Sequence, residues 1–167
     1  RRVMFFPGST LGNFAPTEAQ ALLRRMRELV GAGGGLLLGV DMKKDSARIE
    51  AAYNDAAGVT AAFTLNLLQR LNRELAADFD LDAFRHRARY NPLAGRIETH
   101  LVAQRAQTVQ IDGQVFRFAA GEAMLVEYSA KYDDRDIARL ARQAGFEVDR
   151  RFSDPNGDFC LQYLRGA

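Results

Sequence analysis

Apolar and polar positions at the start of the chain predict a strand, a helix and a second strand. Val3–Phe6 is a short apolar run ended by Pro7-Gly8, which is typical of a strand buried on both faces. A helix is expected from Pro16, because proline suits a first turn, and its apolar residues recur at helical spacing: Ala19, Leu22, Leu23, Met26, Leu29 and Val30. Leu36–Val40 is a second apolar run. This order predicts a right-handed βαβ unit with two parallel strands.

The pattern changes in the middle of the chain. Ser46–Tyr53 and Val59–Ala77 read as helices, and the longer one has apolar residues at every fourth position: Val59, Phe63, Leu67, Leu71 and Leu75. The alternation that follows predicts antiparallel strands at Phe84–Tyr90, Arg96–Gln104, Thr108–Ile111, Gln114–Phe118 and Met124–Tyr132. Asp112-Gly113, between two of these strands, is a strong signal of a β-hairpin.

The end of the chain returns to one helix and two strands. Asp133–Ala144 reads as a helix that Gly145 terminates. Phe146–Phe152 and Phe159–Leu164 read as strands joined across the turn Asp154-Pro155-Asn156-Gly157.

We therefore expect an α/β fold made of two pieces. Residues 1–43 and 133–167 are predicted to form part of a Rossmann-like, doubly wound sheet, and residues 44–132 an inserted α+β domain that covers the strand ends. Ligands of open α/β sheets bind at the carboxyl ends of the strands. The loop Pro7–Asn13 and the turn at Asp41 both lie at that edge.

Composition and charge narrow the class of protein. The chain has 167 residues, of which 47% are hydrophobic and 26% charged, as expected for a globular domain. Its net charge of +2 comes from 23 basic and 21 acidic residues with interleaved signs, so nucleic acid is not an expected partner. No apolar run approaches the roughly 18 residues that a membrane helix needs. We expect a cytoplasmic protein without a membrane partner.

Cysteine and histidine give no support for a metal site. Cys160 is the only cysteine, which excludes an internal disulfide framework and a cysteine-based zinc site. His86 and His100 are the only histidines, and they lack metal-ligand spacing. No cofactor of this kind is expected.

The first strand suggests that the chain is a fragment. Val3–Phe6 reads as a central strand, and nothing precedes it that could pair with it. We therefore expect an exposed apolar strand edge in the isolated chain, and self-association through that edge.

Three segments carry candidate chemistry, each with a purely structural alternative. Gly8–Asn13 is either a flexible connection or a small-ligand loop, since glycines let backbone N–H groups approach a ligand and Asn13 offers a donor and an acceptor. Tyr53 lies at a helix break, where it either packs or points into a cleft. On the strand Met124–Tyr132, Glu127 and Ser129 share one face, where they either meet solvent or recognise a cationic or N–H-bearing group.

Taken together, several stretches resemble a known family, the S-adenosylmethionine-dependent, histidine-specific Nα-methyltransferases of ergothioneine synthesis. The resemblance runs over nearly the whole chain and in the family's order. The stretches that carry it are Phe6–Asn13, Leu37–Asp45, Ala52–Asn66, Leu71–Leu75, Arg96–Glu98, Ala120–Lys131 and Gly157–Phe159.

The resemblance implies a class I methyltransferase fold that binds L-histidine and methylates its α-amine to trimethylhistidine (hercynine). By motif, Asn13 contacts the amine and carboxylate of histidine, Gly8 belongs to the same loop, and Tyr53 contacts the carboxylate. Glu127 and Ser129 recognise the imidazole.

The resemblance also places some functional parts outside the chain. The family's glycine-rich S-adenosylmethionine loop and acidic ribose ligand lie upstream of Phe5, so the isolated chain is expected to be inactive. Two positions depart from the family: Thr99 stands where Met is frequent, and Asn54 where Asp is commoner. The alternatives are a same-family methyltransferase for another amino acid or amine, and a non-catalytic binding or assembly module.

Overall fold

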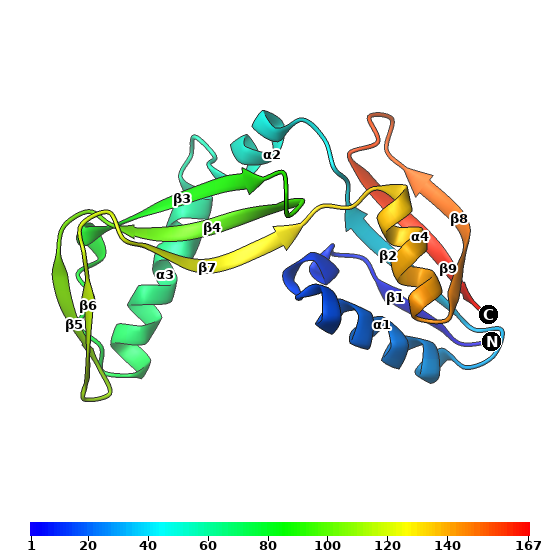
Figure 1. Ribbon diagram of the computed structural model, residues 1–167, viewed down its shortest axis with the longest axis horizontal. Helices are drawn as coiled ribbons and strands as arrows, with labels where there is room; N and C mark the ends of the chain where they lie inside the picture. The colour runs from blue at the N-terminus through cyan, green and yellow to red at the C-terminus, as the bar shows by residue number, and fades with distance from the viewer. The chain divides into compact units, whose positions relative to one another are not determined.

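The computed structural model describes residues 1–167, and the chain divides into two compact units (Figure 1). The first unit contains Arg1–Asp45, Asn91–Arg96 and Ser129–Ala167, and the second contains Ser46–Tyr90 and Ile97–Tyr128. The second unit is thus inserted into the sequence of the first. The division differs from the expected bounds of 44–132, because residues 44–45, 91–96 and 129–132 belong to the first unit.

A four-stranded mixed sheet forms the centre of the first unit. Its strand order is β1 (Val3–Phe6), β2 (Gly35–Asp41), β9 (Phe159–Gly166) and β8 (Phe146–Ser153). As the βαβ pattern predicts, β1 and β2 are parallel, with Val3 opposite Gly35. Strand β9 is antiparallel to both β2 and β8. The carboxyl ends of β1 and β2 therefore meet at one edge of the sheet.

Helices α1 (Pro16–Val30) and α4 (Asp134–Gln143) pack on one face of this sheet (Figure 1). The capping box of α4 is built by Asp133, whose carboxylate accepts a hydrogen bond from the Asp136 N–H at 2.8 Å. Both helices contribute to a single core with β2 and β9, which includes Leu23, Met26, Leu36, Leu38, Val40, Ile137, Phe146 and Leu164.

The position of β1 corrects the expectation of a strand buried on both faces. It forms one edge of the described sheet, with Val3 59% and Phe5 63% exposed. Only Met4 and Phe6 pack against the core. Alternate side chains of a strand point to opposite faces, so α1 covers one half of this apolar run and leaves the other half open.

The second unit packs helices against a three-stranded sheet of order β3 (Phe84–Asn91), β4 (Arg96–Ala103) and β7 (Ala123–Ala130). Its helices are α2 (Ser46–Tyr53), α3 (Val59–Glu74) and the short 3-10 helix η2 (Leu81–Ala83). The predicted hairpin is present as β5 (Gln107–Ile111) and β6 (Gln114–Phe118), with Ile111 opposite Gln114. Phe79, Phe84 and Phe118 form an aromatic cluster in the core.

Helix α3 buries only part of the apolar series at every fourth position, because Leu71 packs against the core and the earlier members do not. Val59, Phe63 and Leu67 are exposed, whereas Leu68 is buried in the core and Leu65 packs against it. Thr64, one turn before Leu68, is also buried, and its hydroxyl donates to the Thr60 carbonyl at 2.9 Å. The buried face is therefore rotated from the one that spacing alone suggests.

Candidate substrate-binding site

The loop between β1 and α1 is bonded to the carboxyl end of β2. Ser9 has a left-handed backbone (φ 54°), and its N–H donates to the Gly39 carbonyl at 3.2 Å. Its hydroxyl accepts the Asp41 N–H at 2.9 Å. The loop continues as the 3-10 helix η1 (Thr10–Asn13), which begins with a hydrogen bond from the Gly12 N–H to the Ser9 carbonyl. Hydrogen bonds thus connect this loop to the end of β2.

Gly12 brings this loop against the end of β7. A Cβ at Gly12 would lie 2.7 Å from the Ala130 carbonyl oxygen and 3.2 Å from the Ser129 hydroxyl oxygen. No ordinary side chain fits that distance to a backbone atom, so the approach depends on glycine. Gly8 and Asn13, by contrast, are exposed. The loop therefore presents Gly8 and Asn13 outward while Gly12 seats it on Ser129 and Ala130.

A cluster of charged side chains lies next to the Ser129 hydroxyl. Lys131 is 3% exposed, and its Nζ lies 2.8 Å from Asp41 Oδ2 and 3.1 Å from Ser129 Oγ. The other carboxylate oxygen of Asp41 lies 2.7 Å from Lys44 Nζ. Lys44 is also 3.9 Å from a carboxylate oxygen of Asp158. Ser129 is itself buried, and its hydroxyl accepts a hydrogen bond from the Lys131 ammonium group.

The protonation of Asp41 follows from these contacts. Burial raises the pKa of this carboxyl, but hydrogen bonds and charge from Lys131 and Lys44 outweigh burial and hold its pKa below the ordinary value. Asp41 is therefore a carboxylate at neutral pH, with both oxygens engaged by lysines.

Tyr53 is the last residue of α2 and is half-buried against Ile49, Ala88 and Ile97. Its carbonyl oxygen is 2.8 Å from His86 Nε2. Asn54 anchors this end of the helix to β3. Its amide accepts the Ala88 N–H and donates to the Ala88 carbonyl, both at 3.0 Å.

Asp55 organises the start of α3 from a position before Gly58, which is the N-cap residue. Its carboxylate accepts the N–H groups of Val59 at 2.8 Å and Thr60 at 2.9 Å. Hydrogen bonds from the Thr60 side chain and then from the backbone N–H groups lower the pKa of Asp55 to about 2. This break between the two helices therefore has an ordered geometry, with Tyr53 on one side of it.

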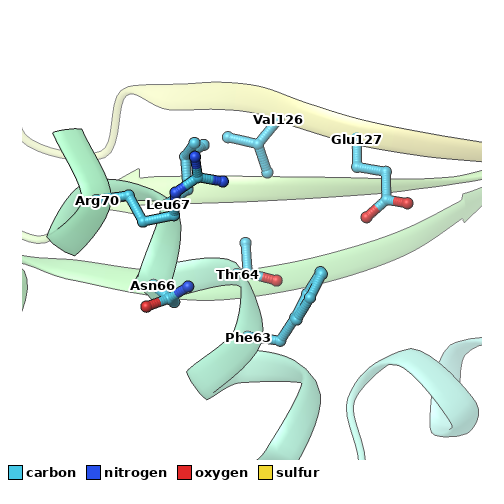
Figure 2. Close-up of a pocket in the computed structure, with 7 residues that line it drawn as sticks. All are labelled: Phe63, Thr64, Asn66, Leu67, Arg70, Val126 and Glu127. Atoms are coloured by element: carbon cyan, nitrogen blue, oxygen red, sulfur yellow. The ribbon is translucent and has the colours of Figure 1, made fainter. Parts of the chain in front are cut away.

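Glu127 is exposed on β7 and lines a pocket of about 310 Å³ against α3 (Figure 2). The carboxylate extends from the strand toward the side where the ring of Phe63 lies. Arg70 also lines the pocket, but its guanidinium is paired with Glu74 at 3.0 Å. The remaining lining residues are Thr64, Asn66, Leu67 and Val126.

The structure distributes the expected site residues over the two units. Gly8, Asn13 and Ser129 lie in the first, and Tyr53 and Glu127 lie in the second. Strand β7 passes from the second unit into the first between Tyr128 and Ser129. Thr99 is 2% exposed on β4.

Sequence reasoning did not single out Lys131. The signal that could have drawn attention to it is composition. Almost all basic residues of the chain are Arg, and the lysines are Lys43, Lys44 and Lys131. Lys44 and Lys131 meet at Asp41, while Lys43 binds Asp133 and Asp136 at 2.9 and 2.6 Å.

Two further features bear on the class of site. The chain contains no group of three or more His, Cys, Asp or Glu side chains arranged to hold a metal ion. None of its helices is both long and apolar enough to cross a membrane.

Comparison with known proteins identifies the family. A family model described as histidine-specific methyltransferase, S-adenosylmethionine-dependent, matches residues 1–166. The chain belongs to this family. It is 45% identical over 163 residues to the histidine N-alpha-methyltransferase of Mycolicibacterium smegmatis, covering 96% of this chain and 51% of that protein. It is 29% identical to an L-tryptophan methyltransferase of Psilocybe serbica, covering 97% of this chain and 46% of that protein.

A solved structure gives the same fold. The CcbJ methyltransferase of Streptomyces caelestis aligns with a TM-score of 0.52 at 20% identity, over all of this chain and 62% of that one. The expected α/β fold of S-adenosylmethionine-dependent methyltransferases is thereby confirmed. The chain spans about half the length of the curated relatives it matches.

Proposed function

We propose that this chain carries the histidine-binding part of an S-adenosylmethionine-dependent histidine Nα-methyltransferase, whose product is trimethylhistidine. The observation that carries the proposal is the Glu127-Tyr128-Ser129 segment of β7. Its serine is seated against the loop that ends in Asn13, and its glutamate lines a pocket. Membership of the family and 45% identity to a protein named histidine N-alpha-methyltransferase support it.

Each residue then has a chemical role. Asn13 and Gly8, exposed at the carboxyl end of β1, bind the amino-acid backbone of the substrate, and Tyr53 binds its carboxylate. The amine needs a free lone pair to react. The neutral carboxamide of Asn13 orients the amine, whereas a carboxylate would stabilise its protonated form. Glu127 accepts an imidazole N–H, and Ser129 bonds the other ring nitrogen. Because methyl transfer is an in-line displacement, positioning of the amine dominates.

The first unit is proposed as part of the methyltransferase core, and the second as the substrate-recognition part. Near the ends of β1 and β2, both oxygens of Asp41 are bonded to lysines and the Ser9 hydroxyl is bonded to the Asp41 N–H. These side chains do not fit a ribose-binding role. We therefore place the S-adenosylmethionine motif outside this chain.

One relative favours a second candidate, a methyltransferase for another amino acid. The chain is 29% identical to an L-tryptophan methyltransferase. Glu127, as an acceptor for a ring N–H, favours histidine over amino acids with apolar side chains. A site built to hydrogen-bond a polar group rejects substrates that lack this group. An indole also carries an N–H, so the two candidates must be separated by assay.

The deciding experiment measures kcat/KM of the full-length protein with S-adenosylmethionine and each of the twenty amino acids. Histidine is expected to be the preferred substrate, and mass spectrometry is expected to show three added methyl groups. A preference for tryptophan or another amino acid would overturn the histidine assignment and leave the family intact.

A further inference from the structure

Lys131 carries an inference that rests on the proposed function and deepens it. A lysine side chain is seldom buried unless it is paired. Here the side chain is 1% exposed, and its Nζ lies within bonding distance of both Asp41 and Ser129. Asp41 already has a second lysine, Lys44, so its negative charge does not by itself require Lys131.

The contact with Ser129 restricts what that hydroxyl can do. An ammonium group donates hydrogen bonds and cannot accept them, so Ser129 Oγ is the acceptor in the 3.1 Å contact. A serine hydroxyl has one proton and two lone pairs, and Lys131 occupies one of these lone pairs. The remaining proton is thereby directed away from Lys131.

We propose that Lys131 is a positioning residue that holds the Ser129 hydroxyl as a hydrogen-bond donor, so that the site takes the neutral imidazole of histidine. Ser129 then bonds the ring nitrogen that has no proton. The other ring nitrogen carries the N–H that Glu127 accepts. An imidazolium ring has an N–H at both positions and meets a hydroxyl already polarised by a cation.

The charged groups near Ser129 come from three parts of the chain. Asp41 and Lys44 come from the end of β2 and the segment after it, Asp158 from the turn before β9, and Lys131 from the residues after β7. The facing 3-10 helix η1 contributes no charged group, and the neighbouring Tyr132 phenol donates to the Leu11 carbonyl at 3.3 Å.

Glu127 acts in the opposite sense, because a carboxylate favours a cationic ring. A site with Glu127 alone would bind imidazolium more tightly than imidazole. The buried charge of Lys131 next to Ser129 opposes this preference. The protonation state of bound histidine therefore distinguishes a site that uses Lys131 from one that does not.

The test uses the full-length protein with ring-15N-labelled histidine and S-adenosylhomocysteine, observed by NMR at about pH 5.5. Free histidine is mostly imidazolium at this pH, since its ordinary side-chain pKa is about 6.5. In the wild type, one protonated and one unprotonated ring nitrogen are expected. Lys131→Met should raise the pKa of the bound imidazole by about one unit, a tenfold change that corresponds to about 1.4 kcal/mol.

Lys44→Met is the matched control, because Lys44 shares Asp41 with Lys131 but does not bond Ser129. It should leave the bound imidazole neutral. An imidazolium in the wild type, or the same titration in wild type and Lys131→Met, would overturn the inference and leave the histidine assignment standing. If the Lys131 variant does not fold, the wild-type spectrum and that of Ser129→Ala, in which the selection should disappear, still decide the question. Failure of labelled histidine to bind at all would overturn the proposed function together with this inference.

Discussion

Gly12→Ala tests whether close contact between the loop and β7 builds the site. The added Cβ would lie 2.7 Å from the Ala130 carbonyl oxygen, 3.0 Å from the Ala130 nitrogen and 3.2 Å from Ser129 Oγ. The first two are backbone atoms, which cannot rotate away as a side chain does. The loop or the end of β7 must therefore shift.

The cost follows from the usual effect of inserting a methyl group into a packed region, about 1–3 kcal/mol. For a domain of this size, each kcal/mol lowers the melting temperature by about 2–4 °C. Thermal unfolding followed by circular dichroism is therefore expected to show a decrease of several degrees. The full-length variant should also have a higher KM for histidine, because Asn13 and Ser129 lose their relative placement.

Gly8→Ala is the control for stability in the same loop. A Cβ at Gly8 would meet only the Thr10 hydroxyl at 3.3 Å, and that side chain can rotate. This variant should unfold close to the wild-type temperature. Equal melting temperatures for Gly12→Ala and the wild type would refute the argument that backbone contact at Gly12 holds the loop.

Three further predictions concern the site and the start of α3. Replacing Glu127 and Ser129 by Ala in the full-length protein should weaken histidine binding by about 1–3 kcal/mol per lost contact and the binding of an apolar amino acid much less. Asn13→Ala should weaken the binding of both substrates alike. Equal losses of kcat/KM for both substrates in the Glu127/Ser129 variant would contradict the assignment. The isolated chain should show no S-adenosylmethionine binding in calorimetry and should self-associate in sedimentation through the open Val3–Phe6 edge, so micromolar binding or a clean monomer at high concentration would count against those proposals. The folded pKa of Asp55, about 2, lies below its ordinary value of 3.8; its contribution to stability is therefore present above about pH 4 and lost as pH falls through 2, and Asp55→Asn should flatten this part of the stability profile measured by thermal unfolding.

Local patterns determined most of the secondary structure. Pro16 does begin α1, Asp112-Gly113 does turn between β5 and β6, and Gly145 follows the end of α4 with a positive φ. Each of these features depends on residues a few positions apart, whose backbone preferences follow from their residue types. The Glu127–Ser129 segment was likewise visible as alternate positions of one strand.

The tertiary structure decided which face of each helix is buried and which distant residues are in contact. The apolar series on α3 at Val59, Phe63 and Leu67 predicted a helix but not its buried face. That face is set by the core residues of the sheet against which Leu68 packs. Spacing describes one element alone, whereas burial depends on which surfaces the other elements leave uncovered.

The charged cluster shows the same limit most clearly. By itself, the sequence determined that Ser129 and Lys131 are two residues apart and that Asp41 ends an apolar strand. Only the fold brings Asp41 and Lys131 to 2.8 Å and buries the lysine beside the Ser129 hydroxyl. The physical reason is that an ion pair between distant residues has no local signature. Its charges meet only after β2 and the end of β7 have been placed side by side by the packing of the core.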